Sequence, residues 1–599
     1  MKILLFLFAF SLSFGTPYIL SGQNSIEQNP SSFFKFDSGS LVYTHDEKGN
    51  RLPDFSFVGY HSGEKPLPNV AVQMTLNPIV GDNTLQIQEA LDQVAKLPLD
   101  DNGHRGALLL KKGVYNIAGT ISIKQSGIVL KGEGDDENGT VLVATGYGDQ
   151  KYKRNFFEVG NTDKIKLDAS SFQEITDNYV PIGTHSFSIK SIEKYKVGDR
   201  IVVYRPSTKS WITAIGCDTI APRWAEIRNI DWVQNTNNKK SGFYYKRVGY
   251  DTPYSILQKK DETWEDFQSR IPLSDDGKSF DFTKQWEPGD YDLYFERKIT
   301  NIQGDKITID APIVHAMESE FGGGGIYHFT TLNRIGEVGI ENLRLISEFG
   351  EPTKDNPYGS SKEQTTSEQH AWNGIVLNEN TENTWIRNVT GNYFGWSLIS
   401  AKGKKATIQD CVNLGHASEI TGGRRYPFMI NGQLNLVQRC VTFEGRHEFV
   451  NQEKTLGPNV FVDCIGFQSK SNAGPHHRYA VGNLYDNITS EKPMESRYRG
   501  NSGTGHGWAG TQTCFYNCVA PEFLVEAPLG GISWVIGSSD NSDKKVQPKS
   551  LYYQQVQDRL GSEVLKYLVS EEQLNAMGSY PWVKNRLSKE DAKFQRLFP

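Results

Sequence analysis

Histidine and arginine side chains gather in four short stretches in the second half of the chain. The stretches are GHASEITGGRRYPF (415–428), EGRHEFVNQEK (444–454), GPHHRYAVG (474–482) and ESRYRGNSGTGHGWAG (495–510). They hold five of the 12 histidines, namely His416, His447, His476, His477 and His506. Imidazoles transfer protons near neutral pH, and guanidinium groups pair with carboxylate or sulfate. If the chain brings these four His/Arg stretches together, they predict a site that moves protons on an anionic ligand.

A four-residue frame recurs along the same half of the chain and indicates how the stretches could meet. Each frame has an apolar lead, usually Asn or Asp in third place, and Cys or an aliphatic residue in fourth place. The leads are Ile340, Ile386, Ile408, Val437, Phe461, Leu484 and Phe515. Successive leads are 46, 22, 29, 24, 23 and 31 residues apart, and the first gap is twice 23. A repeat of about 23 residues with one strand frame each predicts a stacked β-solenoid.

The third residue of the frame predicts a bend in each repeat. The first and fourth residues would face opposite sides of a straight strand, because side chains alternate. Asn and Asp tolerate a left-handed φ, so they can turn the chain and let both apolar residues face inward. The predicted bend residues are Asn342, Asn388, Asp410, Asp463, Asp486 and Asn517, and Arg439 interrupts the pattern. The fourth-place residues Cys411, Cys440, Cys464 and Cys518 are predicted to be buried free thiols, stacked about 4.8 Å apart.

The chain divides into segments by its pattern. The predicted segments are a signal peptide (1–22), an N-terminal cap with the first coils (23–159), an inserted β-subdomain (160–335), the main coils (336–540) and a helical tail (541–599). The first segment has a basic start and an apolar run. The inserted segment alternates apolar and polar residues between Gly-Asp turns, which is typical of a small antiparallel sheet.

The N-terminal cap is predicted to begin with an amphipathic helix. Residues 81–97 place Leu85, Ala90, Leu91 and Val94 at the spacing of one helix face. Short strands separated by glycine turns follow directly. We expect this helix to cover the open end of the solenoid.

Composition excludes several classes of protein. The net charge of −6 and pI near 6.1 argue against a nucleic-acid binder, whose footprint is basic. Six cysteines in 599 residues do not make a disulfide scaffold. After the signal peptide, no segment reaches the roughly 18 apolar residues that a membrane span needs. With its signal peptide and no membrane span, the protein is expected to be secreted or exported to the periplasm. We also expect it to be a monomer.

With these frames and segments, the chain resembles the right-handed parallel β-helix proteins of the pectate-lyase-like superfamily over residues 50–150 and 335–540. The resemblance implies an all-β fold, a right-handed parallel β-helix with an N-terminal capping helix, here carrying an inserted antiparallel β-subdomain. It also implies activity on polysaccharides. The superfamily includes calcium-dependent lyases that bind Ca²⁺ through clustered carboxylates, but the His/Arg stretches hold no comparable Asp cluster. We therefore expect no metal and no other cofactor.

The inventory of the stretches matches β-elimination on a uronic-acid sugar. In that reaction an Arg neutralises the C5 carboxylate, a base removes the C5 proton, and an acid assists departure of the C4 oxygen. We predict His447 or His477 as the base and His506 or Tyr426 as the acid. The predicted substrate-binding residues are Arg424, Arg425, Arg446, Arg478, Arg499, His416, His476 and Trp508. Two enzymes fit equally well. A polysaccharide lyase expels a sugar from C4, and a dehydratase removes a free C4 hydroxyl.

Two other functions stay open. A glycoside hydrolase could use Glu419 and Glu448 as its carboxylate pair. The polygalacturonase-like motifs at 161–163, 275–276 and 505–507 are more than a hundred residues apart, so we interpret them as chance. A non-catalytic glycan-binding protein could use Trp396, Trp508 and Trp534 if these face solvent.

Overall fold

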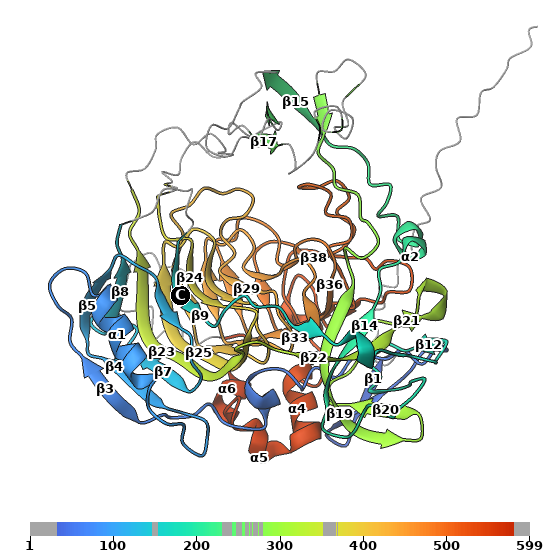
Figure 1. The fold of residues 1–599 in the computed structure, drawn as a ribbon, viewed down its shortest axis with the longest axis horizontal. Coiled ribbons are helices and arrows are strands. Elements are labelled where there is room, and N and C mark those ends of the chain that lie inside the picture. Colours follow the sequence, from blue (N-terminus) through green and yellow to red (C-terminus); the bar gives the residue numbers. More distant parts are fainter. Residues whose placement is uncertain are drawn as a thin grey trace, which may run out of the picture.

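The structure is a computed structural model that describes residues 33–146, 154–229, 279–350 and 369–579, together with 242–246, 254–257, 263, 266, 274 and 367. The predicted signal peptide and the motif at 275–276 lie outside the described residues. The described chain is mostly β, as predicted, and its largest sheet is parallel (Figure 1). None of the helices in these ranges is long and apolar enough to cross a membrane.

The main part of the chain is a stack of parallel strands that pair in chain order. One ladder contains β23 (Ile335–Ser347), β25 (Thr381–Asn392), β27 (Thr407–Gln409), β30 (Leu436–Gln438), β33 (Leu456–Val462), β36 (Ala480–Asp486), β40 (Cys514–Tyr516) and β42 (Trp534–Ile536). A second contains β28 (Val412–Asn413), β31 (Val441–Phe443), β34 (Ile465–Phe467) and β37 (Thr489–Ser490). Each strand therefore lies beside the strand one repeat later.

A separate parallel sheet forms another wall of the stack. Its strands, in spatial order, are β6 (Ile121–Ile123), β9 (Asn155–Val159), β24 (Asn373–Leu377), β26 (Ser397–Ala401), β29 (Phe428–Ile430), β32 (Phe449–Asn451) and β35 (Gly474–Pro475). Two short strands, β38 (Met494–Ser496) and β41 (Phe523–Val525), pair in parallel after it, and β39 (Gly510–Thr511) pairs with β36. Figure 1 shows β24 and β29 of this sheet in the middle of the molecule.

The predicted frame sets the register of the first ladder. Ile340 pairs with Ile386, which pairs with Ile408, and the same position continues through Val437 and Phe461. These leads belong to one apolar core. Cys411, Cys440, Cys464 and Cys518 are fully buried in that core and form no disulfide, which confirms that they are buried free thiols.

The frame near residue 484 is shifted by one position from the prediction. Phe461 pairs with Tyr485, and Tyr485 pairs with Phe515, so Tyr485 and not Leu484 is the lead. The bend consequently falls on Asn487, at φ 54°, and not on Asp486. The other predicted bends are confirmed, with φ between 50° and 59° at Asn342, Asn388, Asp410, Asp463 and Asn517.

Arg439 takes the same bend and does not interrupt the stack. Its φ is 49°, and its side chain is buried. The guanidinium pairs with Asp410 one coil earlier, at 2.7 Å, and donates to the carbonyl of Leu568 in the C-terminal tail at 2.9 Å. These contacts compensate the unfavourable backbone conformation, because left-handed φ is costly for a residue of this size.

The first coils are covered by a helix. They contain β3 (Val72–Leu76), β4 (Gly106–Leu110), β5 (Gly113–Ile117), β7 (Ile128–Lys131) and β8 (Thr140–Ala144). α1 (Thr84–Val94) buries Ile87, Ala90, Leu91 and Val94 against the main core. Leu85, which we predicted on the buried face of this helix, is 66% exposed. Ile87 is buried in its place.

The inserted segment contains an antiparallel sheet. Its strands are β10 (Lys166–Leu167), β11 (Gln173–Glu174), β13 (Ser186–Ser188), β14 (Arg200–Arg205), β19 (Leu293–Gln303), β20 (Lys306–Ile309) and β22 (Gly325–Thr330). The segment also contains β12 (Tyr179–Val180) paired with β21 (Met317–Glu318), the helix α2 (Lys209–Ala214), and a separate sheet of β15 (Trp224–Asn229), β16 (Gly242–Lys246), β17 (Tyr254–Leu257) and β18 (Ser279–Asp281). A second apolar core fills this segment and also includes Leu456, Tyr479 and Val481 from the coils.

A buried ion network joins the antiparallel sheet to the coils. Glu296 of β19 accepts two hydrogen bonds from Arg334, at 2.7 and 2.9 Å, and one from Lys404 at 3.1 Å. Glu382 of β25 pairs with Arg200 of β14 at 2.6 Å and with Lys404 at 3.4 Å. Burial alone raises the pKa of Glu296, but Lys404 and Arg334 outweigh it and lower the pKa to about 2.

The C-terminal tail packs along the outside of the coils. It contains α4 (Leu551–Leu560), α5 (Ser562–Leu565) and α6 (Glu571–Asn575). The buried carboxylate of Asp486 accepts hydrogen bonds from Ser550 Oγ at 2.6 Å and from the backbone N–H of Tyr552 at 2.8 Å. An acidic side chain at the edge of a coil therefore holds the start of α4 in place.

The N-terminal segment binds to the same tail. It forms the hairpin of β1 (Phe34–Asp37) and β2 (Ser40–Tyr43). The backbone N–H of Leu41 donates to Asp558 at 2.9 Å, and that of Phe55 donates to Gln555 at 2.9 Å. Apolar side chains from residues 34–58 and from α4 share one core. The two ends of the described chain are thus packed together.

The ion network predicts acid-sensitive stability. Its contribution is fully present above the ordinary Glu pKa of about 4.5 and is lost as pH falls toward the folded pKa of about 2. We expect Glu296→Gln to lower the free energy of unfolding by about 3–5 kcal/mol at pH 7, because Lys404 and Arg334 lose a buried partner. Urea unfolding at pH 7 and at pH 3 measures this difference, which should shrink at the lower pH.

The matched control is Glu379→Gln, because the Glu379–Lys402 pair at 3.6 Å is largely exposed. We expect it to cost about 1 kcal/mol or less at either pH. An equal cost for Glu296→Gln at pH 7 and pH 3 would contradict the assignment of a lowered pKa.

Candidate functional site

The coils bring five of the predicted side chains into one cluster. Tyr426 precedes β29, His447 precedes β32, and His476 follows β35, so all three leave neighbouring strands of the same sheet. The ring centroids of His447 and His476 are 4.3 Å apart, and Tyr426 lies 5.1 and 5.2 Å from them. His477 and His506 complete the cluster, 5.0 Å from each other and 5.0 and 5.3 Å from His476.

His447 is held as a neutral imidazole with one open nitrogen. Its Nδ1 lies 2.6 Å from the backbone carbonyl of Asn472. A carbonyl can only accept, so Nδ1 carries the proton and Nε2 carries a lone pair. Nε2 has no hydrogen-bond partner among the described residues. Burial and the charges of Arg446 and Arg499 keep the pKa of His447 well below its ordinary value. The ring is therefore neutral at pH 7, with a lone pair at Nε2 that can accept a proton.

His476 is held in the opposite tautomer. Arg499 Nη1 donates to its Nδ1 at 3.0 Å and to its backbone carbonyl at 2.6 Å. Because an arginine can only donate, Nδ1 must be the acceptor and Nε2 must carry the proton. Nε2 lies 3.1 Å from the hydroxyl oxygen of Tyr426 and donates to it. Burial and the neighbouring His447 lower the pKa of His476, which keeps the ring neutral.

The hydroxyl oxygen of Tyr426 is surrounded by donors. Arg446 Nη1 donates to it at 3.1 Å, His476 Nε2 at 3.1 Å, and the backbone N–H of Gly423 approaches at 3.4 Å. The oxygen has two lone pairs, so these donors occupy them and leave the phenolic proton to point elsewhere. The same donors would stabilise the oxygen once that proton has been given away. Tyr426 is thus arranged as a proton donor.

Arg446 and Arg499 place positive charge beside His447. In the described part of the chain, neither guanidinium has a carboxylate within ion-pairing distance. Burial lowers the pKa of Arg499 and Arg446 adds to this effect, although the charge of Glu495 opposes it. Both side chains are half-buried. Two half-buried arginines without an ion pair are groups to which an anion would bind.

His477, His506 and Arg478 form the outer rim of the cluster. Arg478 pairs with Glu453 at 3.1 Å and donates to the carbonyl of Thr504 at 3.2 Å. Burial lowers the pKa of His477 to about 4, although Glu453 opposes this shift. Burial and the neighbouring His477 lower the pKa of His506 to about 2. These rings are neutral at pH 7, but no hydrogen bond to Nδ1 from the described residues fixes their tautomers as in His447 and His476.

Four predicted binding residues lie apart from this arrangement. His416 is saturated, because Nδ1 bonds to the carbonyl of Phe394 at 2.8 Å and Nε2 to the amide of Asn413 at 3.1 Å. Arg425 is buried and donates to the carbonyl of Ser418 at 2.8 Å. The other two turn toward other segments: Arg424 lies over the ring of Trp372, and Trp508 donates to the carbonyl of Ile215.

The two carboxyl groups that a glycoside hydrolase would use, those of Glu448 and Glu419, are both buried. Glu448 is fully buried, and its carboxyl group lies against Gly466 on the next coil. Burial raises the pKa of Glu448 to about 8, so the carboxyl is largely protonated at pH 7. Glu419 is also buried. The suggestion that Trp534 faces solvent is wrong, because this side chain is 1% exposed.

Several residues at the site were missed by the sequence argument. The carbonyl of Asn472 and the backbone N–H of Gly423 fix His447 and Tyr426, but backbone groups leave no signal in a sequence. Arg223 of the inserted segment donates to the carbonyl of Gly503, next to His506. Within the described ranges, no three His, Cys, Asp or Glu side chains form a group that could hold a metal ion.

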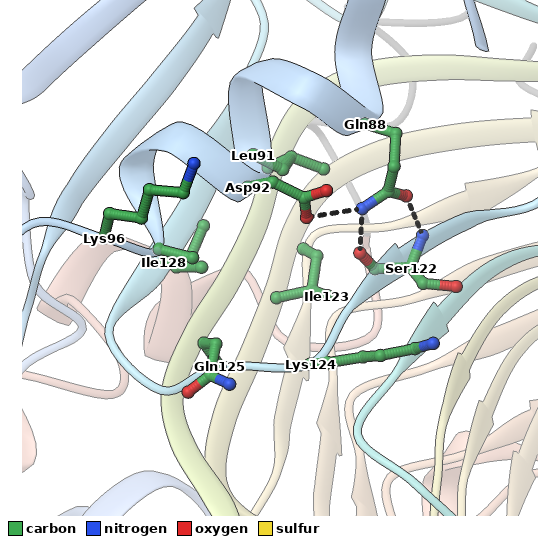
Figure 2. A pocket seen from close by; sticks show the side chains of 10 residues that line it. Gln88, Leu91, Asp92, Lys96, Ser122, Ile123, Lys124, Gln125 and Ile128 are labelled. Carbon is green, nitrogen blue, oxygen red and sulfur yellow. Dashed lines mark hydrogen bonds between the residues drawn. The ribbon is translucent and has the colours of Figure 1, made fainter. Parts of the chain in front are cut away.

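A hollow of about 780 Å³ lies at the N-terminal cap, between α1 and the segment around β6. Figure 2 shows Gln88 of α1 bonded to Asp92 and to the backbone of Ser122. Gln88 donates to Asp92 and to the carbonyl of Ser122, and accepts from the N–H of Ser122. These bonds brace the helix on the strand.

Comparisons with known proteins give only a distant likeness. No family model matches the sequence, and no curated protein matches it either. The tailspike protein gp49 from Pseudomonas phage LKA1 is 11% identical, with a TM-score of 0.35 over 74% of this chain and 66% of that one. The tailspike of E. coli bacteriophage HK620, solved with a pentasaccharide, is 10% identical, with a TM-score of 0.31 over 84% of this chain and 57% of that one.

A third solved tailspike, from Acinetobacter baumannii bacteriophage AP22 with a capsular saccharide, is 9% identical with a TM-score of 0.20. The chain thus spans about two thirds or less of the first two structures. Likeness at this level carries no argument, and the resemblance to the pectate-lyase-like superfamily stays a prediction. The function is therefore argued from the histidine cluster itself.

The cluster predicts two neutral histidines of opposite tautomer. In ¹⁵N NMR spectra of histidine-labelled protein, His447 should give an Nδ1–H signal and His476 an Nε2–H signal. Neither should titrate between pH 8 and pH 6, because the pKa of each ring is lowered by burial and by positive neighbours. His447→Gln assigns one signal. Titration of either ring near the ordinary His pKa would contradict the arrangement.

Proposed function

We propose that this protein is a secreted or periplasmic carbon–oxygen lyase that acts by β-elimination on a uronic-acid-containing poly- or oligosaccharide. The observation that carries the proposal is the arrangement around His447: its Nε2 is unbonded, its ring lies 5.1 Å from that of Tyr426, and the charges of Arg446 and Arg499 are close by. A base, an acid and a carboxylate site are what the reaction requires. We further propose that the coils form a right-handed parallel β-helix.

The mechanism follows from these positions. The C5 carboxylate binds to Arg446 and Arg499, which withdraw electron density and make the C5 proton more acidic. His447 Nε2 accepts that proton, and the electron pair forms the C4–C5 double bond as the C4–O bond breaks. Tyr426 donates its proton to the departing oxygen, and its own oxygen remains bound by Arg446 and His476. Return of the proton from His447 to Tyr426, whose rings are 5.1 Å apart, restores both groups.

His447 is a better base than His477. The open nitrogen of His447 is defined by a strong bond at its other nitrogen, whereas Nδ1 of His477 lies 3.9 Å from Glu453 and is not fixed. Tyr426 is a better acid than His506, because its hydroxyl oxygen is held by Arg446 and His476. His506, with a pKa of about 2, does not carry the second proton that an imidazole acid needs at pH 7. We therefore assign His477, His506 and Arg478 to substrate binding at the rim.

The hydrolase and the simple binding protein are less well supported. A hydrolase needs two carboxyl groups on either side of the scissile bond, and Glu448 is enclosed by Gly445 and Gly466. A binding protein would need the arginines but not the opposite tautomers of His447 and His476. A leaving C4 sugar makes the enzyme a polysaccharide lyase, and a leaving hydroxyl makes it a dehydratase.

The direct test is to incubate the protein with a panel of uronate glycans and follow the ultraviolet absorbance of the new C4–C5 double bond. Pectin, alginate, ulvan and glycosaminoglycans each contain a suitable uronate, and shortened oligosaccharides test for dehydration. We expect absorbance to rise with at least one of them. New reducing ends without new absorbance would instead show hydrolysis.

Variants of the cluster test the assigned roles. We expect His447→Gln and Tyr426→Phe to lower kcat by about 10²–10⁴-fold, because each removes a general base or acid. Glu448→Gln is the matched control on the residue next to His447 and should leave kcat unchanged. Steady-state kinetics on an active substrate measure kcat for all three variants. Full activity in the two cluster variants, with loss in Glu448→Gln, would favour the carboxylate-based hydrolase.

The arginines should control substrate binding. We expect Arg446→Ala and Arg499→Ala each to reduce kcat/KM by an amount equivalent to about 1.5–3 kcal/mol, since each removes a charge-assisted contact. Activity should also fall as ionic strength rises, because salt screens the attraction. Kinetics that are unchanged in both variants would place the anion site elsewhere.

A further inference from the structure

The segment that carries His476 and His477 ends in two residues with unfavourable backbone conformations. Arg478 has φ 53° and Tyr479 has φ 73°. Neither is glycine, and consecutive left-handed residues with large side chains are costly. Such conformations persist only where surrounding contacts hold them, and they concentrate at functional sites. Contacts outside the segment must therefore hold these two residues in position.

The inserted segment supplies those contacts to Tyr479. The Tyr479 side chain is 1% exposed, and its ring lies 5.0 Å from Trp211 of α2 and 5.7 Å from Trp286, edge-on in both cases. Its hydroxyl lies 2.9 Å from Nε2 of His315. Trp211, Trp286 and His315 all belong to the inserted segment, and Tyr479 belongs to the coils. One side chain thus connects the two parts directly beside the site.

The bond between Tyr479 and His315 has a defined direction. His315 Nδ1 lies 2.7 Å from the carbonyl of Ala316, so Nδ1 carries the proton and Nε2 accepts from the Tyr479 hydroxyl. Burial and the charge of Arg205 keep the pKa of His315 well below its ordinary value. The ring is consequently a constant acceptor across the working pH range.

The inserted segment also holds the loop that carries His506. Arg223 donates to the carbonyl of Gly503 at 3.2 Å, and the N–H of Lys284 donates to the carbonyl of Thr504 at 3.1 Å. Thr504 in turn accepts from Arg478. Trp508, at the end of the same loop, donates to the carbonyl of Ile215 at 2.9 Å. Both loops that bear rim histidines are therefore braced from the same side.

We infer that Tyr479 and His315 are positioning residues, through which the inserted segment fixes the loop of His476, His477 and Arg478 for the reaction. This inference rests on the proposed function for its catalytic consequence. The hydrogen bond and the aromatic contacts set the backbone of Tyr479, which sets Arg478 and, through the preceding residues, the ring of His476. His476 in turn donates to Tyr426, the proposed acid.

The test compares Tyr479→Phe, which removes only the hydroxyl, with Tyr195→Phe. Tyr195 is a matched control, because it is a buried tyrosine of the inserted segment whose hydroxyl donates to the carbonyl of Ser171 at 2.6 Å, away from the site. Hydrogen exchange of peptides covering 474–482 should increase about tenfold in Tyr479→Phe and remain unchanged in Tyr195→Phe. On an active glycan, kcat should fall about 10–100-fold in Tyr479→Phe with KM changed much less, since misplaced groups mainly lower the rate of chemistry.

A pair of variants at His315 tests the direction of the bond. His315→Gln retains an acceptor for the Tyr479 hydroxyl and should keep near wild-type exchange and kcat, whereas His315→Leu has no acceptor and should reproduce Tyr479→Phe. The inference is wrong if Tyr479→Phe leaves both exchange and kcat unchanged, or if Tyr195→Phe or His315→Gln causes the same losses. Hydrogen exchange needs no substrate, so it decides the positioning role even if the protein proves not to be a lyase.

Discussion

The left-handed bend at the third position of the repeated frame is the constraint on which the rest of the structure depends. It lets two apolar residues three apart enter the same core, and repeating it coil after coil keeps the strands in parallel register. Asn388 even donates its side-chain amide to Asn342 on the previous coil at 3.1 Å. Arg439 shows that the stack requires the backbone angle and not the residue type, provided that other contacts compensate its cost. Loops that leave at the same phase of each coil then meet.

Much of the fold could be predicted because the frame is a local pattern. The repeat, the buried thiols and the bends follow from residue types a few positions apart. The error at Leu484 came from two adjacent apolar residues, Leu484 and Tyr485, either of which satisfies the pattern, and only pairing with Phe461 and Phe515 decides between them. The contacts of the inserted segment with the coils could not be predicted, because they join residues such as His315 and Tyr479 that are far apart in the chain.

The candidate site could be predicted in its composition but not in its proton arrangement. The stacking of loops brings His447, His476, His477 and His506 together with Tyr426, as expected. The sequence could not tell that His416 is saturated by a carbonyl and an amide, nor that Arg499 sets the tautomer of His476. These outcomes depend on atoms a few ångströms apart on different coils. The four histidines and the tyrosine of the cluster therefore differ in their proton arrangement because their neighbours differ.

The packing of the N-terminal hairpin against α4 has a consequence for biosynthesis. A chain that emerges from the ribosome can stack its coils in order, because each coil pairs with the one made just before it. The segment from Phe34 to Phe55 cannot complete its packing in this way, since Asp558 and Gln555 are made some five hundred residues later. The packing of this segment is therefore completed only after α4 has been made, so the closing of α4 over it comes late in folding.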